Sequence, residues 1–240
     1  NLIVQYNMSP ETITESQAPN GVLGYLESDP IPRDFRNQNI TIAANGSTYD
    51  KSKQGILPQI IIDYYAERSD VKKKMLAKER EYQKEKTFHL EKEINQLENQ
   101  QMAIKILLNS LYGALGNKHF RYFDMRMAEG ITLSGQLSIM WAEKAMNKEM
   151  NRILKTENRD YVIAMDTDSL YINMGPLVKQ LNPKDPVAAL DKICSEHFEK
   201  VLEKSYAELF DKQQAYTNRM VMAREVIANR GIWTAKKRYI

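Results

Sequence analysis

The sequence has one cysteine, three histidines and no long hydrophobic run. A single cysteine, Cys194, cannot form an internal disulfide, which excludes a disulfide-stapled fold and suits a reducing compartment. No apolar stretch approaches the roughly 18 residues that span a bilayer, and no signal peptide opens the chain, so we expect a cytoplasmic protein without a membrane partner. The net charge of +3 is too small to indicate nucleic acid by itself.

The composition is that of an ordinary globular protein. A length of 240 residues, with 42% hydrophobic and 27% charged residues, allows one large domain or two smaller ones. The first residues begin in the middle of an apolar pattern and there is no initiator Met, so we expect that an upstream element is missing. Near the other end, residues 226–240 contain four cations and no acid.

A polar turn at residues 165–170 lies between two runs rich in aromatic and β-branched residues, a pattern that predicts a β-hairpin. Two carboxylates two residues apart on extended chain point to the same side. Because they repel each other unless a cation lies between them, Asp166 and Asp168 are candidate ligands for a hard divalent ion. A solvated turn is the alternative interpretation.

Residues 58–115 predict two long helices. Pro58 suits a first helical position, and two seams with spacings of three and four run through residues 61–82 and 90–111. The short connection around residues 84–87 predicts that the helices fold back antiparallel. A plain coiled-coil hairpin or a dimerisation arm is one interpretation of this pattern.

Polar residues interrupt these seams in one place. Arg68 and Gln101 take positions that antiparallel pairing puts nearly opposite each other. Lys72 lies one turn from Arg68, and Lys105 and Asn109 follow Gln101 at steps of four, on one face. Because polar seam residues cost stability, their clustering indicates a ligand surface, and three cations suit a polyphosphate.

The remaining elements complete an α+β fold. Residues 1–57 predict irregular chain with short strands and a hairpin turn at Asn45-Gly46. We then expect helices over residues 127–154 and 186–210, a strand over 220–228 and a return strand from 232. This order predicts an antiparallel sheet with helices on one face, from which the two-helix unit projects.

Three motifs resemble those of family B DNA polymerases. Residues 105–113 are similar to the fingers motif K-x-x-x-N-S-x-Y-G, residues 166–169 to the palm motif D-T-D-S, and residues 236–239 to the motif K-K-x-Y. Arg68 and Lys72 match the R-x-x-x-K spacing of the family's other triphosphate ligands. The similarity covers essentially the whole chain and is closest to the replicative polymerases of tailed bacteriophages.

The resemblance implies a palm at residues 1–57 and 116–240 and fingers at 58–115. It implies DNA-directed DNA synthesis, in which two Mg²⁺ ions promote transfer of a dNTP to a primer 3′-hydroxyl. The implied partners are primer-template DNA, the dNTP and a sliding clamp bound through regions absent here. A viral parent would act in the cytoplasm of its host.

The same resemblance assigns roles to individual residues. Asp168 would be the stronger metal ligand, with Asp166 nearby, and Glu225 is a candidate third carboxylate, a surface strand residue being the alternative. The other expected contacts are with the triphosphate (Arg68, Lys72, Lys105, Asn109), the nascent base pair (Tyr112, Gly113) and the primer strand (Lys236, Lys237, Tyr239).

Two departures from the family pattern matter. The first palm motif, which supplies another metal-binding Asp, would lie just upstream of Asn1, so we expect little or no polymerase activity from these 240 residues. Ala164-Met165 also stands where the family usually has an aromatic residue and Gly, which could alter how the hairpin meets the primer end. A non-catalytic nucleic-acid-binding module remains the alternative function, whereas a structural coiled coil has no need of the seam cations.

Overall fold

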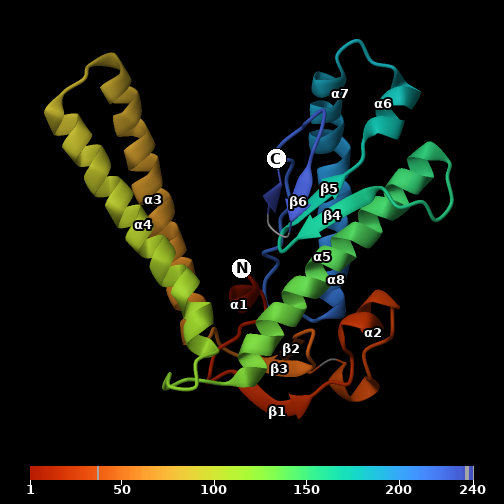
Figure 1. Ribbon diagram of the computed structural model, residues 1–240. Coiled ribbons are helices and arrows are strands. Elements are labelled where there is room, and N and C mark those ends of the chain that lie inside the picture. The colour runs from red at the N-terminus through yellow and green to blue at the C-terminus, as the bar shows by residue number, and fades with distance from the viewer. Residues whose placement is uncertain (37, 236–237, 240) are drawn as a thin grey trace.

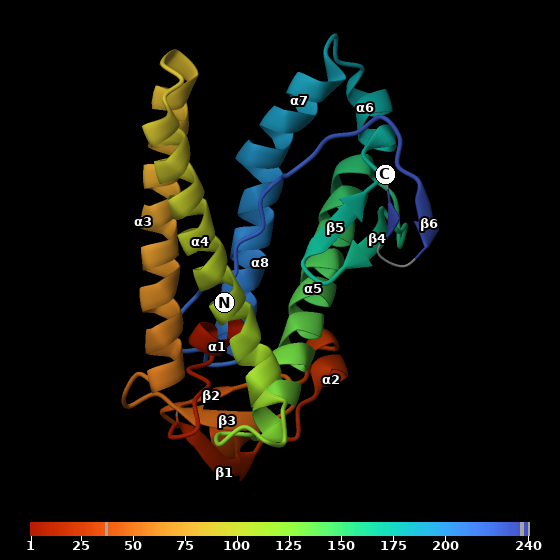
Figure 2. The same cartoon turned by 60° about the vertical axis from the view of Figure 1, so that its left-hand side comes forward.

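The computed structural model describes residues 1–36, 38–235 and 238–239 (Figure 1). Two long antiparallel helices stand away from the rest of the molecule in both views (Figures 1 and 2): α3 (Ile56–Lys84) and α4 (Phe88–Leu115). The hydroxyl of Thr87 caps the start of α4 by accepting the Leu90 N–H, and Gly116 ends it. The predicted helical hairpin is therefore confirmed. In the described part of the chain no helix is long and apolar enough to cross a membrane.

A small three-stranded antiparallel sheet closes the base of the molecule. Its strand order is β1 (Ile13–Gln17), β3 (Ser47–Asp50), β2 (Ile40–Ile42), and α1 (Leu2–Gln5), α2 (Val22–Leu26) and a 3₁₀ turn η1 (Arg33–Phe35) accompany it. Gly46 ends the predicted β2–β3 turn with a φ of 85°, and a Cβ there would lie 2.1 Å from the Ala18 carbonyl oxygen. Only glycine fits this position.

Helix α5 (Met125–Leu154) connects the base with the upper half of the molecule. Asp124 caps its start, and the helix ends at Lys155, which has a left-handed φ of 53°. The buried face of α5 joins the two main cores: Met127 lies in the basal core beneath α3 and α4, and Met146 and Met150 lie in the upper core. This matches the predicted helix at residues 127–154.

The upper half packs a hairpin and a helical run against α5. The hairpin is formed by β4 (Val162–Asp166) and β5 (Ser169–Ile172). After it come α6 (Gly175–Leu181), α7 (Pro186–Ile193), a π-helical turn η2 (Cys194–Phe198) and α8 (Glu199–Lys212). The helix predicted at residues 186–210 is thus continuous but contains one wider turn.

The strand predicted over residues 220–228 is wrong. The segment has no regular secondary structure, and Val221 and Val226 are 88% and 75% exposed. A strand leaves its backbone groups unpaired unless a neighbour hydrogen-bonds to it, and no described strand does so here. The return strand predicted from residue 232 is instead divided into two short strands, β6 (Trp233–Ala235) and β7 (Arg238–Tyr239), which pair with each other. The α+β class is confirmed, with the described strands in three small antiparallel sheets.

Candidate active site

The turn between β4 and β5 is tighter than the polar sequence predicted. Asp166 pairs with Ser169, so only Thr167 and Asp168 form the loop. The Asp168 N–H donates to the Asp166 carbonyl at 2.5 Å across Thr167, whose φ is 51°. A β-branched residue in this left-handed region is strained, at about 1–3 kcal/mol, and such strain clusters at functional sites.

The two carboxylates of this turn do not share one extended strand. Asp166 ends β4, is half-buried and accepts the Thr167 hydroxyl through Oδ1 at 3.0 Å. Asp168 lies in the turn itself, exposed, and no hydrogen bond or ion pair engages its side chain within the described residues. The alternation of strand side chains therefore does not align the pair, because Asp168 lies in the turn after β4 has ended.

The structure does not add a third ligand to this pair. Among the residues it describes, no three His, Cys, Asp or Glu side chains gather where they could hold a metal ion. Glu225 is exposed in the irregular segment before β6, so its role as a third carboxylate stays a prediction. Asp166 and Asp168 nevertheless offer carboxylate oxygens, the hard donors that Mg²⁺ prefers. They fit part of a magnesium site.

The seam cations lie on the helical hairpin as the sequence predicted. Arg68 is half-buried on α3, whereas Lys72, Lys105 and Asn109 are exposed. None of the three cations forms an ion pair with a described carboxylate. Cations without an ion-pair partner retain their full attraction for an anionic ligand.

Tyr112 and Gly113 occupy the last turns of α4. Tyr112 is 43% exposed, and a Cβ built on Gly113 would meet no other atom within 4 Å. Glycine inside a helix is destabilising by roughly 0.5–1 kcal/mol relative to alanine. The protein itself therefore gives no steric reason for glycine at this position, which is consistent with a ligand that needs the space.

The strand before the C-terminal motif contacts the β4–β5 hairpin. Lys236 and Lys237 lie outside the described residues, and Tyr239 is on β7. Just before them, the Trp233 ring meets the Tyr171 ring of β5 edge to face, with centroids 5.4 Å apart. No local sequence pattern predicts this contact, because it joins two segments that are distant in the chain.

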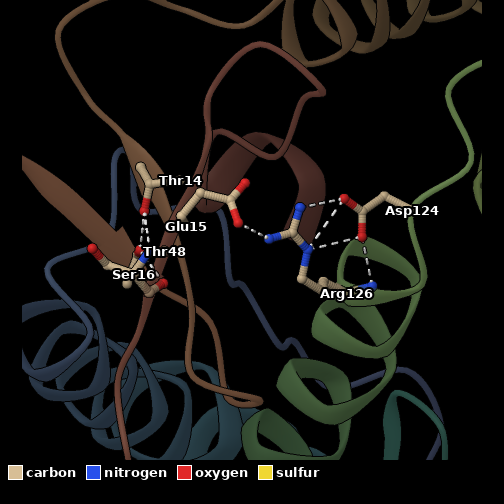
Figure 3. Close-up of polar contacts among 6 residues, drawn as sticks. All are labelled: Thr14, Glu15, Ser16, Thr48, Asp124 and Arg126. Carbon is tan, nitrogen blue, oxygen red and sulfur yellow. Dashed lines mark hydrogen bonds and ion pairs between the residues drawn. The ribbon is translucent and has the colours of Figure 1, made fainter.

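Sequence reasoning also missed an ion-pair network at the start of α5 (Figure 3). Arg126 donates to the Asp124 carboxylate at 2.7 Å and reaches Glu15 on β1 at 3.5 Å. Hydrogen bonding from Arg126 lowers the pKa of Asp124 below its ordinary value. Next to it, the Thr14 and Thr48 hydroxyls are 2.5 Å apart and join β1 to β3. The network fixes the start of α5 on the basal sheet, just after α4 ends.

Comparisons with known proteins agree with the motifs. The model of DNA polymerase family B matches residues 1–230. A DNA-directed DNA polymerase of Enterobacteria phage T4 is 30% identical over 294 aligned residues, covering 99% of this chain and 32% of that protein. One from Escherichia phage RB69 is 28% identical with the same coverage, 99% and 32%. The chain thus spans about a third of the length of these relatives.

Among solved structures, the family B DNA polymerase from the hyperthermophilic archaeon Pyrobaculum calidifontis resembles the chain. The TM-score is 0.47 and the sequence identity is 22%, over 82% of this chain and 20% of that one.

Proposed function

Because the chain belongs to the family B DNA polymerases, we propose that it forms the palm and fingers of a DNA-directed DNA polymerase. We assign the fingers to residues 58–115, which comprise most of α3, the short connection after it and all of α4. The palm then comprises residues 1–57 and 116–240. The bound substrates would be primer-template DNA and a dNTP.

One observation carries this proposal: the Trp233–Tyr171 contact. It supports a common site for two motifs that are far apart in the sequence, since Trp233 precedes Lys236 and Lys237 and Tyr171 follows Asp168 on the same hairpin. Carboxylates suit the metal ions of nucleotidyl transfer, and lysines suit the phosphates of a primer strand. If the Asp166–Asp168 turn were only a solvated turn and the lysine motif only a surface loop, there would be no reason for the two segments to lie together.

Asp168 and Asp166 are the residues that would hold Mg²⁺. Two such ions, when bound, would activate the primer 3′-hydroxyl and stabilise the charge that develops on the α-phosphate. In the described part of the chain no group of three His, Cys, Asp or Glu side chains that could hold a metal ion forms at the hairpin. We therefore expect little polymerase activity from the 240 residues alone, because two ions need more ligands than two carboxylates supply.

The fingers cations would bind the triphosphate. Arg68 can grip phosphate oxygens as a fork, and Lys72 and Lys105 act as point charges. Asn109 would orient the same group by hydrogen bonding. Tyr112 and Gly113, on the following turns of α4, would contact the nascent base pair, where a change in volume affects the fit.

Replacement of one carboxylate tests the catalytic assignment. In a polymerase that carries this chain, Asp168→Asn should abolish nucleotide incorporation and leave the affinity for primer-template unchanged. Asp211→Asn, an exposed change on α8, is the matched control. If Asp168→Asn leaves both incorporation and DNA binding intact, the catalytic assignment fails and a non-catalytic nucleic-acid-binding module becomes the better interpretation.

Replacement of one lysine tests the triphosphate site. Lys105→Ala should raise the apparent KM for dNTP or lower kcat, because it removes a charge that neutralises the triphosphate. Lys92→Ala, also exposed on α4 but nearer the tip of the hairpin, should change neither constant. An effect of Lys105→Ala confined to DNA affinity would contradict the assignment.

A further inference from the structure

The fingers hairpin buries a hydrogen-bond donor and an acceptor that have no partner among the described residues. These are Nε of Arg68 on α3 and Oε1 of Gln101 on α4. A buried polar atom without a partner loses its water and gains nothing in return. Since each of these atoms lacks a partner in this state, both residues are candidates for a second arrangement that supplies one.

The register of the two helices puts these atoms at nearly the same level. Gln100 donates to the Glu67 carboxylate across the hairpin at 3.4 Å, and Lys78 pairs with Glu93 nearer the tip at 3.3 Å. Arg68 and Gln101 each follow one member of the first pair by one residue. With antiparallel helices and a rise of about 1.5 Å per residue, their Cα atoms differ by only about 3 Å along the hairpin.

The direction of helical side chains brings the two groups toward each other. Side chains lean toward the N-terminus of their own helix. Arg68, slightly nearer the tip, therefore leans toward the base, and Gln101, slightly nearer the base, leans toward the tip. A change of side-chain rotamer is the movement that would join Nε–H of Arg68 to Oε1 of Gln101.

We propose that Gln101 is a positioning residue for the triphosphate site, which rests on the function proposed above. When a triphosphate is bound by Arg68, Lys72 and Lys105, the Gln101 amide oxygen accepts a hydrogen bond from the Nε–H of Arg68. This fixes one edge of the guanidinium and leaves its two outer nitrogens for a bidentate grip on phosphate. Arg68 is half-buried, with its Nε covered by the protein.

A neutral acceptor suits this role better than an acid would. A carboxylate in place of Gln101 would hold Arg68 equally well but would cancel its charge, as buried ion pairs do. In the described structure no carboxylate pairs with Arg68. Gln101 therefore orients the guanidinium while its full charge remains available to the phosphates.

The test measures binding of inorganic tripolyphosphate to the 240-residue chain by calorimetry at low salt. Gln101→Leu should weaken binding about tenfold, the effect of losing one hydrogen bond to a charged group. The same variant should raise the melting temperature by about 2–4 °C, because leucine suits a heptad seam and removes a buried unpaired acceptor. A structural role would lower stability and binding together. Gln100→Leu, at the neighbouring exposed position, should leave tripolyphosphate binding unchanged.

Two further variants separate this inference from the proposed function. Gln101→Glu should weaken binding as much as Gln101→Leu, and in an Arg68→Lys background, which lacks the Nε–H, Gln101→Leu should have no further effect. If Gln101→Leu binds like the wild type while Arg68→Ala and Lys105→Ala bind weakly, the positioning role is wrong and the triphosphate site stands. If the wild type does not bind, or if none of these changes matters, both are wrong.

Discussion

The ring of Trp233 meets the ring of Tyr171 at an interplanar angle of 89°, so the edge of one aromatic faces the plane of the other. Such a pair contributes about 0.5–1.5 kcal/mol beyond the area it buries. Here it joins the C-terminal hairpin to the strand that follows Asp168. Within the described residues it is a small contact, but it holds β6, the strand before Lys236, against β5.

Removal of this contact should weaken DNA binding more than folding. Trp233→Ala should lower the affinity for a labelled primer-template about threefold to tenfold at fixed salt, because β6 is no longer held against β5 by this ring contact. The melting temperature should change little, since Trp233 is 42% exposed. Trp233→Phe keeps an aromatic edge and is the matched control. Equal affinity for DNA in Trp233→Ala and wild type, measured by fluorescence anisotropy, would contradict the prediction.

A methyl group at Gly113 should raise the stability of the chain but lower the activity of the polymerase. Gly113→Ala should stabilise the chain by about 0.5–1 kcal/mol, because alanine favours a helix and the added Cβ meets no protein atom. In a polymerase that carries this chain it should lower kcat/KM for the correct dNTP about tenfold, if the methyl intrudes on the nascent base pair.

The control for Gly113→Ala is Gly135→Ala on α5, where a Cβ would make only an ordinary contact, 3.5 Å from Leu2. It should stabilise the chain and leave incorporation unchanged. Unaltered incorporation in Gly113→Ala would remove the base-pair role of this position.

The regular elements follow from local patterns in the sequence, and the contacts between them do not. Heptad spacing predicts α3 and α4, and a turn between apolar runs predicts the β4–β5 hairpin. The same local reasoning fails at residues 220–228, where an apolar pattern has no partner strand to pair with. It also misses the π-helical turn at Cys194–Phe198, because one extra residue in a helical turn leaves the surrounding apolar stripe nearly unchanged.

For the candidate site, the residue types could be predicted, but their arrangement could not. Arg68 and Gln101 follow from the spacing of the seam, since an antiparallel hairpin has few possible registers. The left-handed Thr167 that turns Asp168 away from β4 depends on hairpin geometry, and nothing in the polar sequence requires it.

An ion-pair cluster between α5 and the π-helical turn should make stability depend on pH. Arg152 donates two hydrogen bonds to Glu149, at 2.6 and 2.8 Å, and His197 lies 2.5 Å from the same carboxylate. Arg152 above all, then His197, lowers the pKa of Glu149 to about 2. An unfolded Glu titrates near pH 4.3.

Because the folded pKa of Glu149 is the lower one, its stabilisation is present above about pH 5 and is lost as the pH falls toward 2. Glu149→Gln should therefore lower the melting temperature at pH 7 by a few degrees and match the wild type near pH 2. Glu143→Gln on the same helix is the control with the opposite sign, because burial and then Asp160 raise the pKa of Glu143. That variant should be more stable than wild type at pH 7. If the melting temperatures of Glu149→Gln and wild type differ by the same amount at every pH from 2 to 7, the assignment is contradicted.

The link between the first residues and the end of α8 should be a sensitive point for folding. Tyr6 and Gln213 are fully buried, and the Tyr6 hydroxyl donates to the Gln213 side-chain oxygen. Burial raises the pKa of Tyr6 to about 12, so the hydroxyl stays neutral and keeps its proton at pH 7. Tyr6→Phe leaves a buried oxygen unpaired, which costs about 1–3 kcal/mol.

For a chain of this size, that loss should lower the melting temperature by about 3–8 °C in calorimetry. Tyr65→Phe, at a position 55% exposed on α3, should leave it within about one degree. Tyr6→Phe combined with Gln213→Leu should recover part of the loss, because removal of both partners leaves no orphan oxygen. A Tyr6→Phe variant as stable as wild type would show that water or another group replaces the tyrosine.

The segment from α8 to β6 runs beside this pair, since the Tyr216 N–H donates to the Gln5 carbonyl at 2.8 Å. Destabilisation here should therefore also loosen the C-terminal hairpin and weaken DNA binding.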